Sequence, residues 1–120
     1  MSRASLRIPT GWLVEWNSLT EPPEGKDRPP LDDLTQDLLL LRNQHFGVLV
    51  DLGWYPEFSP RGHFRLTALR LENGQDAQVE AWDSPLRVKK SRSYSKIRAT
   101  LEDWLEDTTL ANFRTHDGAA

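Results

Sequence analysis

The chain has 120 residues, no cysteine and a formal net charge of −3. This length supports one hydrophobic core and hence one domain over residues 1–120, while the lack of cysteine excludes a disulfide scaffold and a thiolate metal site. The acidic balance argues against direct nucleic-acid binding, which usually needs a basic surface. No apolar run approaches the roughly 18 residues of a membrane span, and no signal peptide is evident, so we expect a soluble, cytoplasmic protein without a membrane partner.

The N-terminal segment is predicted to fray and then enter a strand. Residues 1–10 are mostly polar, with nothing evident to anchor them. In residues 11–19, Trp12, Val14 and Trp16 alternate as they would in a strand, although Trp12 and Trp16 also fit helical spacing. The richness in Trp and Val favours the strand.

A proline-rich loop and a short helix are predicted next. Residues 20–30 contain four prolines, which interrupt any regular element, so they should form a loop. Residues 31–43 carry leucines at intervals of three and four, and aspartates lie near their start, where the helix dipole favours negative charge. These features favour a short helix, although the leucine run could also enter a strand. The aspartates are Asp32, Asp33 and Asp37.

The clearest strand pattern begins at residue 48 and predicts a β-hairpin. Its alternating apolar residues are Val48, Val50, Leu52 and Trp54. Pro56 should end regular pairing, and residues 59–62, Ser-Pro-Arg-Gly, carry proline and glycine where a type I turn prefers them. Strands are therefore expected over residues 46–55 and 63–72.

The second strand of this hairpin shows a shift in its apolar positions. The apolar set moves from Phe64 and Leu66 to Leu69 and Leu71. Such a shift indicates either a β-bulge or a strand that is buried on both faces at its end.

A tight turn and a fourth strand are expected after the hairpin. Asn73 and Gly74 form a strong turn signal. The strand is predicted over residues 77–90, where Asp-Ser-Pro at residues 83–85 should divide it into two pieces or introduce a bulge. Its inward-facing candidates are Val79, Ala81, Leu86 and Val88.

The last element is predicted to be an amphipathic helix. Ser91 or Ser93 can cap its start, and residues 108–120 lose the pattern and should fray. Charged side chains occupy the opposite face of the helix. The apolar stripe consists of Tyr94, Ile97, Leu101, Trp104 and Leu105.

These elements predict an α+β fold. It should have an antiparallel sheet of about four strands, with the C-terminal helix packed on one face and the second, short helix nearby. The residues expected in the core are Trp54, Leu66, Ile97, Leu101 and Trp104.

No catalytic signature is present. His45, Asp51 and His63 could meet if their strands pair, and two histidines with one carboxylate can bind a metal, so a small metal-dependent enzyme is an alternative. However, histidines at a strand entrance or beside a turn glycine are usually structural. Asp51 can simply face solvent or pair with Arg65 or Arg70. We therefore expect no enzymatic activity, metal or cofactor.

The loop after residue 54 and the acidic segment are the candidate contacts for a protein partner. Tyrosine and other aromatic residues dominate interface energetics, although these rings could also only cover the end of the hairpin. The acidic groups could attract a basic partner. The candidate contact residues are Tyr55, Glu57, Phe58, Asp32, Asp33 and Asp37.

Several motifs resemble a known group of small bacterial proteins. Residues 51–57 read DLGWYPE and residues 60–64 read PRGHF; Trp82 and Pro85 follow, and a Ser-Arg-Ser helix start leads to a final Trp-Leu. This pattern resembles the immunity proteins of polymorphic-toxin and contact-dependent growth inhibition systems. The likeness covers about residues 44–106.

The resemblance implies a stoichiometric inhibitor that binds the C-terminal domain of a cognate toxin. Toxin domains of this type are often basic nucleases, and an acidic inhibitor would complement them electrostatically. An adaptor domain without a toxin partner is a further alternative. No catalytic residue is implied for this chain.

Overall fold

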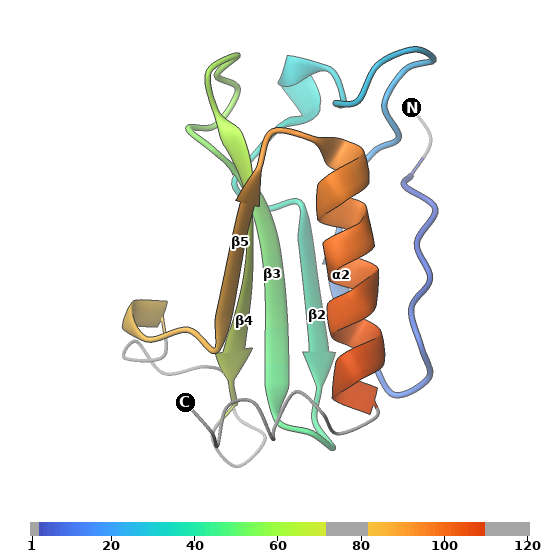
Figure 1. Cartoon of the computed structure of the whole chain (residues 1–120), viewed down its shortest axis with the longest axis vertical. Helices are drawn as coiled ribbons and strands as arrows, with labels where there is room; N and C mark the ends of the chain where they lie inside the picture. Colours follow the sequence, from blue (N-terminus) through green and yellow to red (C-terminus); the bar gives the residue numbers. More distant parts are fainter. Residues whose placement is uncertain (1–2, 72–81, 110–120) are drawn as a thin grey trace.

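The computed structural model describes residues 3–71 and 82–109 and has an α+β architecture (Figure 1). Five strands form one antiparallel sheet, whereas about four were predicted. The described residues contain one α-helix of 16 residues and one short 3-10 turn. The elements are β1 (Leu13–Asn17), η1 (Leu31–Asp33), β2 (Leu39–Asn43), β3 (Val48–Tyr55), β4 (His63–Arg70), β5 (Arg87–Ser91) and α2 (Tyr94–Thr109).

The strands follow one another across the sheet in the order of the chain. The predicted hairpin is confirmed as β3 and β4, which pair without a register shift from Val48 opposite Arg70 to Tyr55 opposite His63. The apolar shift in β4 therefore reflects burial on both faces and not a bulge. Leu66 and Ala68 lie in the main core, and Leu69 is buried with Leu49 and Leu71 in a second cluster.

The predicted helix over residues 31–43 is wrong. Only Leu31–Asp33 form a 3-10 turn, and Leu39–Asn43 form strand β2 between β1 and β3. In this position β2 can bond to a neighbour on both sides and bury leucines on both of its faces. These gains outweigh the helix propensity of leucine, which is high in rank but small in free energy. The Leu38 amide already donates to the Leu52 carbonyl at 3.0 Å, so pairing begins before the strand proper.

The ambiguous segment at residues 11–19 is a strand, as predicted. β1 pairs with β2, and its register shifts between Val14 and Trp16. Trp12 lies just before the strand and is buried, with its indole nitrogen 3.4 Å from the Leu105 carbonyl of α2.

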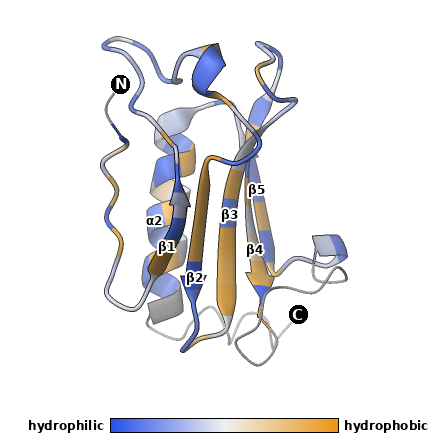
Figure 2. Cartoon of the chain, turned by 180° about the vertical axis from the view of Figure 1, so that it is seen from behind, coloured by the Kyte–Doolittle hydropathy of each residue, from blue (hydrophilic) through white to orange (hydrophobic). Residues whose placement is uncertain are grey.

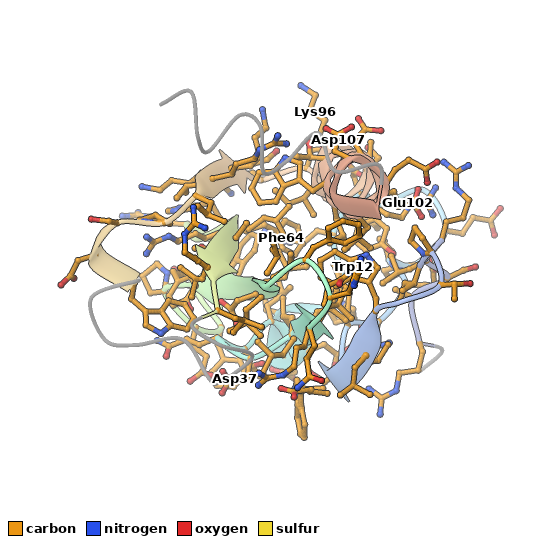
Figure 3. The ribbon with its side chains drawn as sticks, turned by 90° about the horizontal axis from the view of Figure 1, so that it is seen from below. Trp12, Asp37, Phe64, Lys96, Glu102 and Asp107 are labelled. Atoms are coloured by element: carbon orange, nitrogen blue, oxygen red, sulfur yellow. The ribbon has the colours of Figure 1, made fainter. Side chains whose placement is uncertain are left out.

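The main core lies between the sheet and α2 (Figure 1). Viewed from below, Phe64 and Trp12 point into the space between the sheet and the helix (Figure 3). All five residues predicted for the core are buried, and so is the whole apolar stripe of the helix. The stripe comprises Tyr94, Ile97, Leu101, Trp104 and Leu105.

Residues from the proline-rich loop cap the start of α2. The Ser93 hydroxyl accepts from the Lys96 amide at 3.2 Å, which confirms Ser93 as the N-cap. Asp27 reaches the same turn: its carboxylate accepts from the Ser95 amide at 2.8 Å and from the Ser93 hydroxyl. The Asp27 carbonyl also accepts from the Tyr94 amide at 2.9 Å. The predicted loop is therefore tied to the helix that it precedes by more than sixty residues.

Replacing Asp27 with asparagine should lower the free energy of unfolding by about 0.5 kcal/mol at neutral pH, because hydrogen bonds to a charged carboxylate become weaker, neutral ones at this exposed position. The hydrogen bond from Ser93 is the main cause that lowers the pKa of Asp27. A lowered pKa stabilises the fold above the unfolded value of 3.8, and this contribution is lost as the pH falls through the folded value. Urea denaturation across acidic pH should show the difference between the two proteins shrinking, and Glu24→Gln, on the same exposed loop, serves as the control.

The expectation that residues 1–10 fray does not hold for residues 3–8. Arg3 forms a β-bridge with Thr20, and the Ala4 amide donates to the Leu19 carbonyl at 2.9 Å. Farther along, the Arg7 amide donates to the Glu102 carboxylate at 2.8 Å. Apolar side chains at alternate positions of this segment pack on the core and hold it there.

The predicted fourth strand is shorter and oriented differently. The described strand is β5, which begins at Arg87 after the Asp-Ser-Pro interruption. Leu86 packs against the main core, but Val88 is 40% exposed and the prediction that it faces inward is wrong. The predicted turn at residues 73–74 and the inward candidates Val79 and Ala81 lie outside the described residues, as does most of the segment predicted to fray at 108–120.

Candidate functional site

One face of the sheet is not covered by α2, and we call it the uncovered face. Seen from behind, the sheet lies in front of the helix and the strands are open to view (Figure 2). Strand pairing places on this face the side chains that alternate with the core residues. Its described residues are unequally exposed: Trp16 and Val88 are exposed, Leu40, Asp51 and Arg65 are half-buried, and Arg42, Leu49, Thr67 and Leu69 are buried.

Trp16 is the most prominent side chain of the uncovered face. It is 54% exposed, although its indole nitrogen donates to the Asp37 carbonyl at 2.7 Å. The Ser18 hydroxyl donates to the same carbonyl at 2.8 Å. These bonds fix the position of the indole while leaving much of its surface open to solvent. An ordered aromatic ring of this kind loses little entropy on binding.

A hollow of about 310 Å³ opens beside Trp16. It is lined by Trp16, Asp37, Leu39, Leu40 and Asp51. A neighbouring hollow of about 370 Å³ shares Asp37, Leu40 and Asp51 and extends toward Trp82, which is 44% exposed. Figure 3 shows Asp37 on the side of the sheet away from the helix. The two hollows thus form a continuous depression between two exposed tryptophans.

Asp51 is the unusual charge in this depression. Burial raises the pKa of the Asp51 carboxyl to about 6, and the nearby Asp37 carboxylate adds to the rise, while Arg65 opposes it. Within residues 3–71 and 82–109, no hydrogen bond or ion pair reaches the Asp51 carboxylate. Among these residues Asp51 therefore forms no ion pair with Arg65 or Arg70, although the charge of Arg65 acts on it from a longer distance. The alternative prediction, a position facing solvent, holds only in part because Asp51 is half-buried.

Two arginines on the uncovered face differ in how they are satisfied. Arg42 is buried and forms a two-bond ion pair with Glu15, with distances of 2.6 and 3.3 Å. This pair is neutral as a whole. Arg65 lies opposite Gly53 on the neighbouring strand, and its buried Nε atom has no hydrogen-bond partner. A buried donor without a partner is costly, so the uncovered face carries unsatisfied groups of both signs.

The candidate contacts in the hairpin loop have both structural and exposed roles. Glu57 accepts from the Gln36 amide at 3.1 Å, so its carboxylate holds the segment before β2. Phe58 is 49% exposed and has a φ of 62°, which a bulky residue adopts only where its surroundings fix it. Its amide donates to the Leu34 carbonyl at 2.8 Å. Tyr55 is half-buried at the end of β3, on the uncovered face, and burial raises the pKa of its hydroxyl.

Gly62 and Ser59 of the hairpin loop fit tightly around Trp54, and Arg92 holds the loop in place. A Cβ on Gly62 would lie 2.4 Å from the Trp54 indole nitrogen, so only glycine fits there. That nitrogen donates to the Ser59 carbonyl at 2.9 Å. Arg92 donates to the carbonyls of Gly62 and Pro60 at 2.7 and 2.8 Å. Packing therefore accounts for much of the motif that suggested the family resemblance.

The remaining acidic candidates lie at the same end of the molecule as the hairpin loop (Figure 1). Asp32 and Asp33 belong to the 3-10 turn. Asp33 accepts from the Thr20 hydroxyl at 3.0 Å, and Asp32 is exposed. They are not on a helix with Asp37, as was predicted, and only Asp37 lines the depression.

The two histidines of the alternative metal set are not brought together with Asp51. His45 lies in the turn before β3, whereas His63 pairs with Tyr55 at the far end of that strand. Eight residues of strand separate these ends by roughly 23 Å. Among the described residues, no group of three or more His, Asp or Glu side chains could hold a metal ion.

The sequence analysis named Asp37 and Asp51 as candidates but missed Trp16, Leu40 and Trp82, which also line the depression. Trp16 was predicted in a strand and Leu40 in a helix, and no contact between these two elements was predicted. Trp82 was named only as one residue of the motif that carries the family resemblance. Their proximity depends on β2 lying beside β1, which local patterns do not determine. One pattern in the sequence did point to the uncovered face. Leu49 and Asp51 alternate with the core residues of the same strand, so their side chains must lie on the opposite side of the sheet.

No family model matches the chain, and no match was found among curated proteins or among solved structures. In the part of the chain that the structure describes, no helix has the length and apolar character needed to cross a bilayer.

Proposed function

We propose that this chain is an immunity protein that neutralises a bacterial toxin domain by binding it through the uncovered face. The depression between Trp16 and Trp82 is the observation that carries this proposal. Exposed tryptophans beside a depression that holds half-buried charges are typical of the energetic centre of a protein interface. The family resemblance of the hairpin region supplies the class of partner, and the protein would act in the cytoplasm without catalysis.

The proposed contact surface includes the earlier candidates at one end. Asp37 lines the depression, Tyr55 lies on the same face near enough for Asp51 and Asp37 to raise the pKa of its hydroxyl, and Phe58 is exposed at the neighbouring loop. Glu57, Asp32 and Asp33 would contribute charge at the rim, where electrostatic attraction speeds association more than it tightens binding. A nuclease toxin, being basic, would suit such a rim.

The test is growth of cells that express the C-terminal toxin domain encoded immediately upstream, with and without this chain. Growth arrest that only this protein relieves, together with co-purification of the two proteins, would support the proposal. Arrest that it does not relieve, or no arrest at all, would remove the toxin as partner and leave the adaptor alternative.

Trp16→Ala should abolish protection and weaken binding to the toxin domain by about thirtyfold or more, since interface tryptophans often contribute at least about 2 kcal/mol. The measurement is the dissociation constant by calorimetry, paired with the growth assay. Lys96→Ala, on the outer face of α2 (Figure 3), is the control and should bind normally. Equal affinity of both variants would contradict the assignment of the uncovered face as the interface.

A further inference from the structure

We propose that the hollow beside Trp16 receives an arginine side chain of the partner, whose guanidinium stacks on the indole and bonds to the carboxylates of Asp37 and Asp51. This inference rests on the proposed function, and it names the chemistry that the partner must present to the uncovered face.

The side chains that line the hollow give it a negative charge. Among the described residues, its lining contains two carboxylates and no cationic side chain. Arg42 lies in the adjoining hollow, but Glu15 already engages it through two hydrogen bonds. Arg65 is near enough to act on Asp51 electrostatically, yet Asp37 has the larger influence. The hollow is therefore complementary to a positive charge that residues 3–71 and 82–109 do not supply within it.

The two carboxylates are free to bind such a charge. Neither the Asp51 nor the Asp37 side chain has a hydrogen-bond or ion-pair partner among the described residues. The bonds to Asp37 go to its backbone carbonyl, so they position the residue and leave its carboxylate available. An anionic group that is partly removed from water and lacks a partner gains most from a charged donor.

The apolar part of the hollow distinguishes arginine from a metal or a small hydrated cation. Leu40 contributes an apolar wall, and Trp16 contributes an exposed indole whose nitrogen is already bonded to the Asp37 carbonyl. A guanidinium is planar, weakly hydrated and able to stack on an aromatic ring while it bonds to carboxylates. The volume of about 310 Å³ is at the lower end of the range for small-molecule sites, which suits one long side chain.

The test uses the full chain and needs no toxin. The indole resonances of the 15N-labelled protein are followed by NMR at neutral pH during titration with N-acetylarginine methylamide. We expect a saturable shift of the Trp16 indole with a dissociation constant on the order of millimolar, and none for the buried Trp54 indole. The citrulline analogue, which has the same shape without the charge, should leave both resonances in place.

Variants separate the site from a general effect of charge. Asp51→Asn should weaken binding by about tenfold or more, the equivalent of one charge-assisted hydrogen bond. Asp37→Asn should weaken it too, and it gives a second route if the first variant misfolds. Asp103→Asn, an equal charge change on exposed α2, should bind as the unchanged protein does.

An absent shift, an equal response to citrulline, or full binding by Asp51→Asn would overturn the arginine site. These results do not depend on the growth assay. Relief of toxicity without arginine binding would remove only the arginine site, whereas arginine binding without relief of toxicity would keep the site and remove the toxin.

Discussion

Gly53→Ala should destabilise the protein by roughly 3 kcal/mol, at the upper end of what an extra buried methyl group costs. A Cβ at this position would lie 2.2 Å from the Gln36 carbonyl oxygen and 2.9 Å from the Gln36 carbonyl carbon. These are backbone atoms, so no side chain can rotate away. The segment cannot move readily either, because the Thr35 carbonyl accepts from the Trp54 amide and the Leu38 amide donates to the Leu52 carbonyl.

Urea denaturation measures this loss, and Gly25→Ala is the matched control. Gly25 has a positive φ of 79°, but no atom lies within 4 Å of the Cβ that alanine would add. Its replacement should therefore cost only the strain of a left-handed alanine, about 1 kcal/mol. If Gly53→Ala were as stable as Gly25→Ala, the close crossing of residue 36 over β3 would be contradicted.

Asp51→Asn should stabilise the protein by about 2 kcal/mol at neutral pH. The pKa of Asp51 is raised in the folded state from 3.8 to about 6, mainly because burial disfavours the charged form. A rise of this size corresponds to roughly 3 kcal/mol, which water at the half-buried carboxylate reduces. Asparagine keeps the shape of the side chain and removes the desolvated charge.

The raised pKa of Asp51 also determines how the stability of the protein changes with pH. Between pH 3.8 and about 6 the folded protein holds a proton on Asp51 that the unfolded chain has released, so stability falls as the pH rises. Above about pH 6 Asp51 is ionised in both states, and the full cost of burying its charge lowers the stability of the fold. Below pH 3.8 Asp51 is protonated in both states, and this cost is absent. The gain from asparagine should therefore be full at neutral pH and vanish near pH 3.8. Denaturation of both proteins across this range measures it, and a gain that does not vary with pH would contradict the cause.

A carboxylate that destabilises its own fold is easier to understand if it binds something. Proteins often accept a loss of stability at functional positions. A stabilised Asp51→Asn protein that no longer binds arginine would show both effects of one side chain.

The sequence predicted those parts of the fold that depend on local pattern. The alternation through Trp54 and the turn residues around Pro60 led to the hairpin, and the spacing from Tyr94 to Leu105 led to the helix and its buried stripe. In both elements the local signals agree with one another. The spacing of the apolar residues matches the face that is buried, and the turn or cap residues match the ends of the element. The sequence shows the glycines at 53 and 62, but it does not predict that Gln36 and Trp54 lie too close to them for any side chain.

Long-range pairing could not be predicted in the same way. Leu39–Asn43 is a strand because it lies between two other strands, and its leucines fit either periodicity. Asp27 caps a helix far along the chain, which no local pattern reveals. The candidate site has the same origin, since Trp16, Asp37 and Asp51 come from three separate segments. Sequence reasoning found Asp51 unusual but could not tell which sheet face would remain uncovered.

The attachment of α2 to the first part of the chain affects the order of folding. Each strand of the sheet pairs with its neighbour in sequence, so sheet formation closes comparatively short loops. The helix instead bonds to Arg7, Trp12 and Asp27, which are between 68 and 95 residues distant along the chain. Contacts of such high sequence separation form slowly because a long loop must close first. The helix also follows β5 directly and packs on β5 and β4, which are near it in the sequence. The sheet and the helix can therefore assemble first, and closure of the N-terminal segment and the proline-rich loop over them completes the barrier to water.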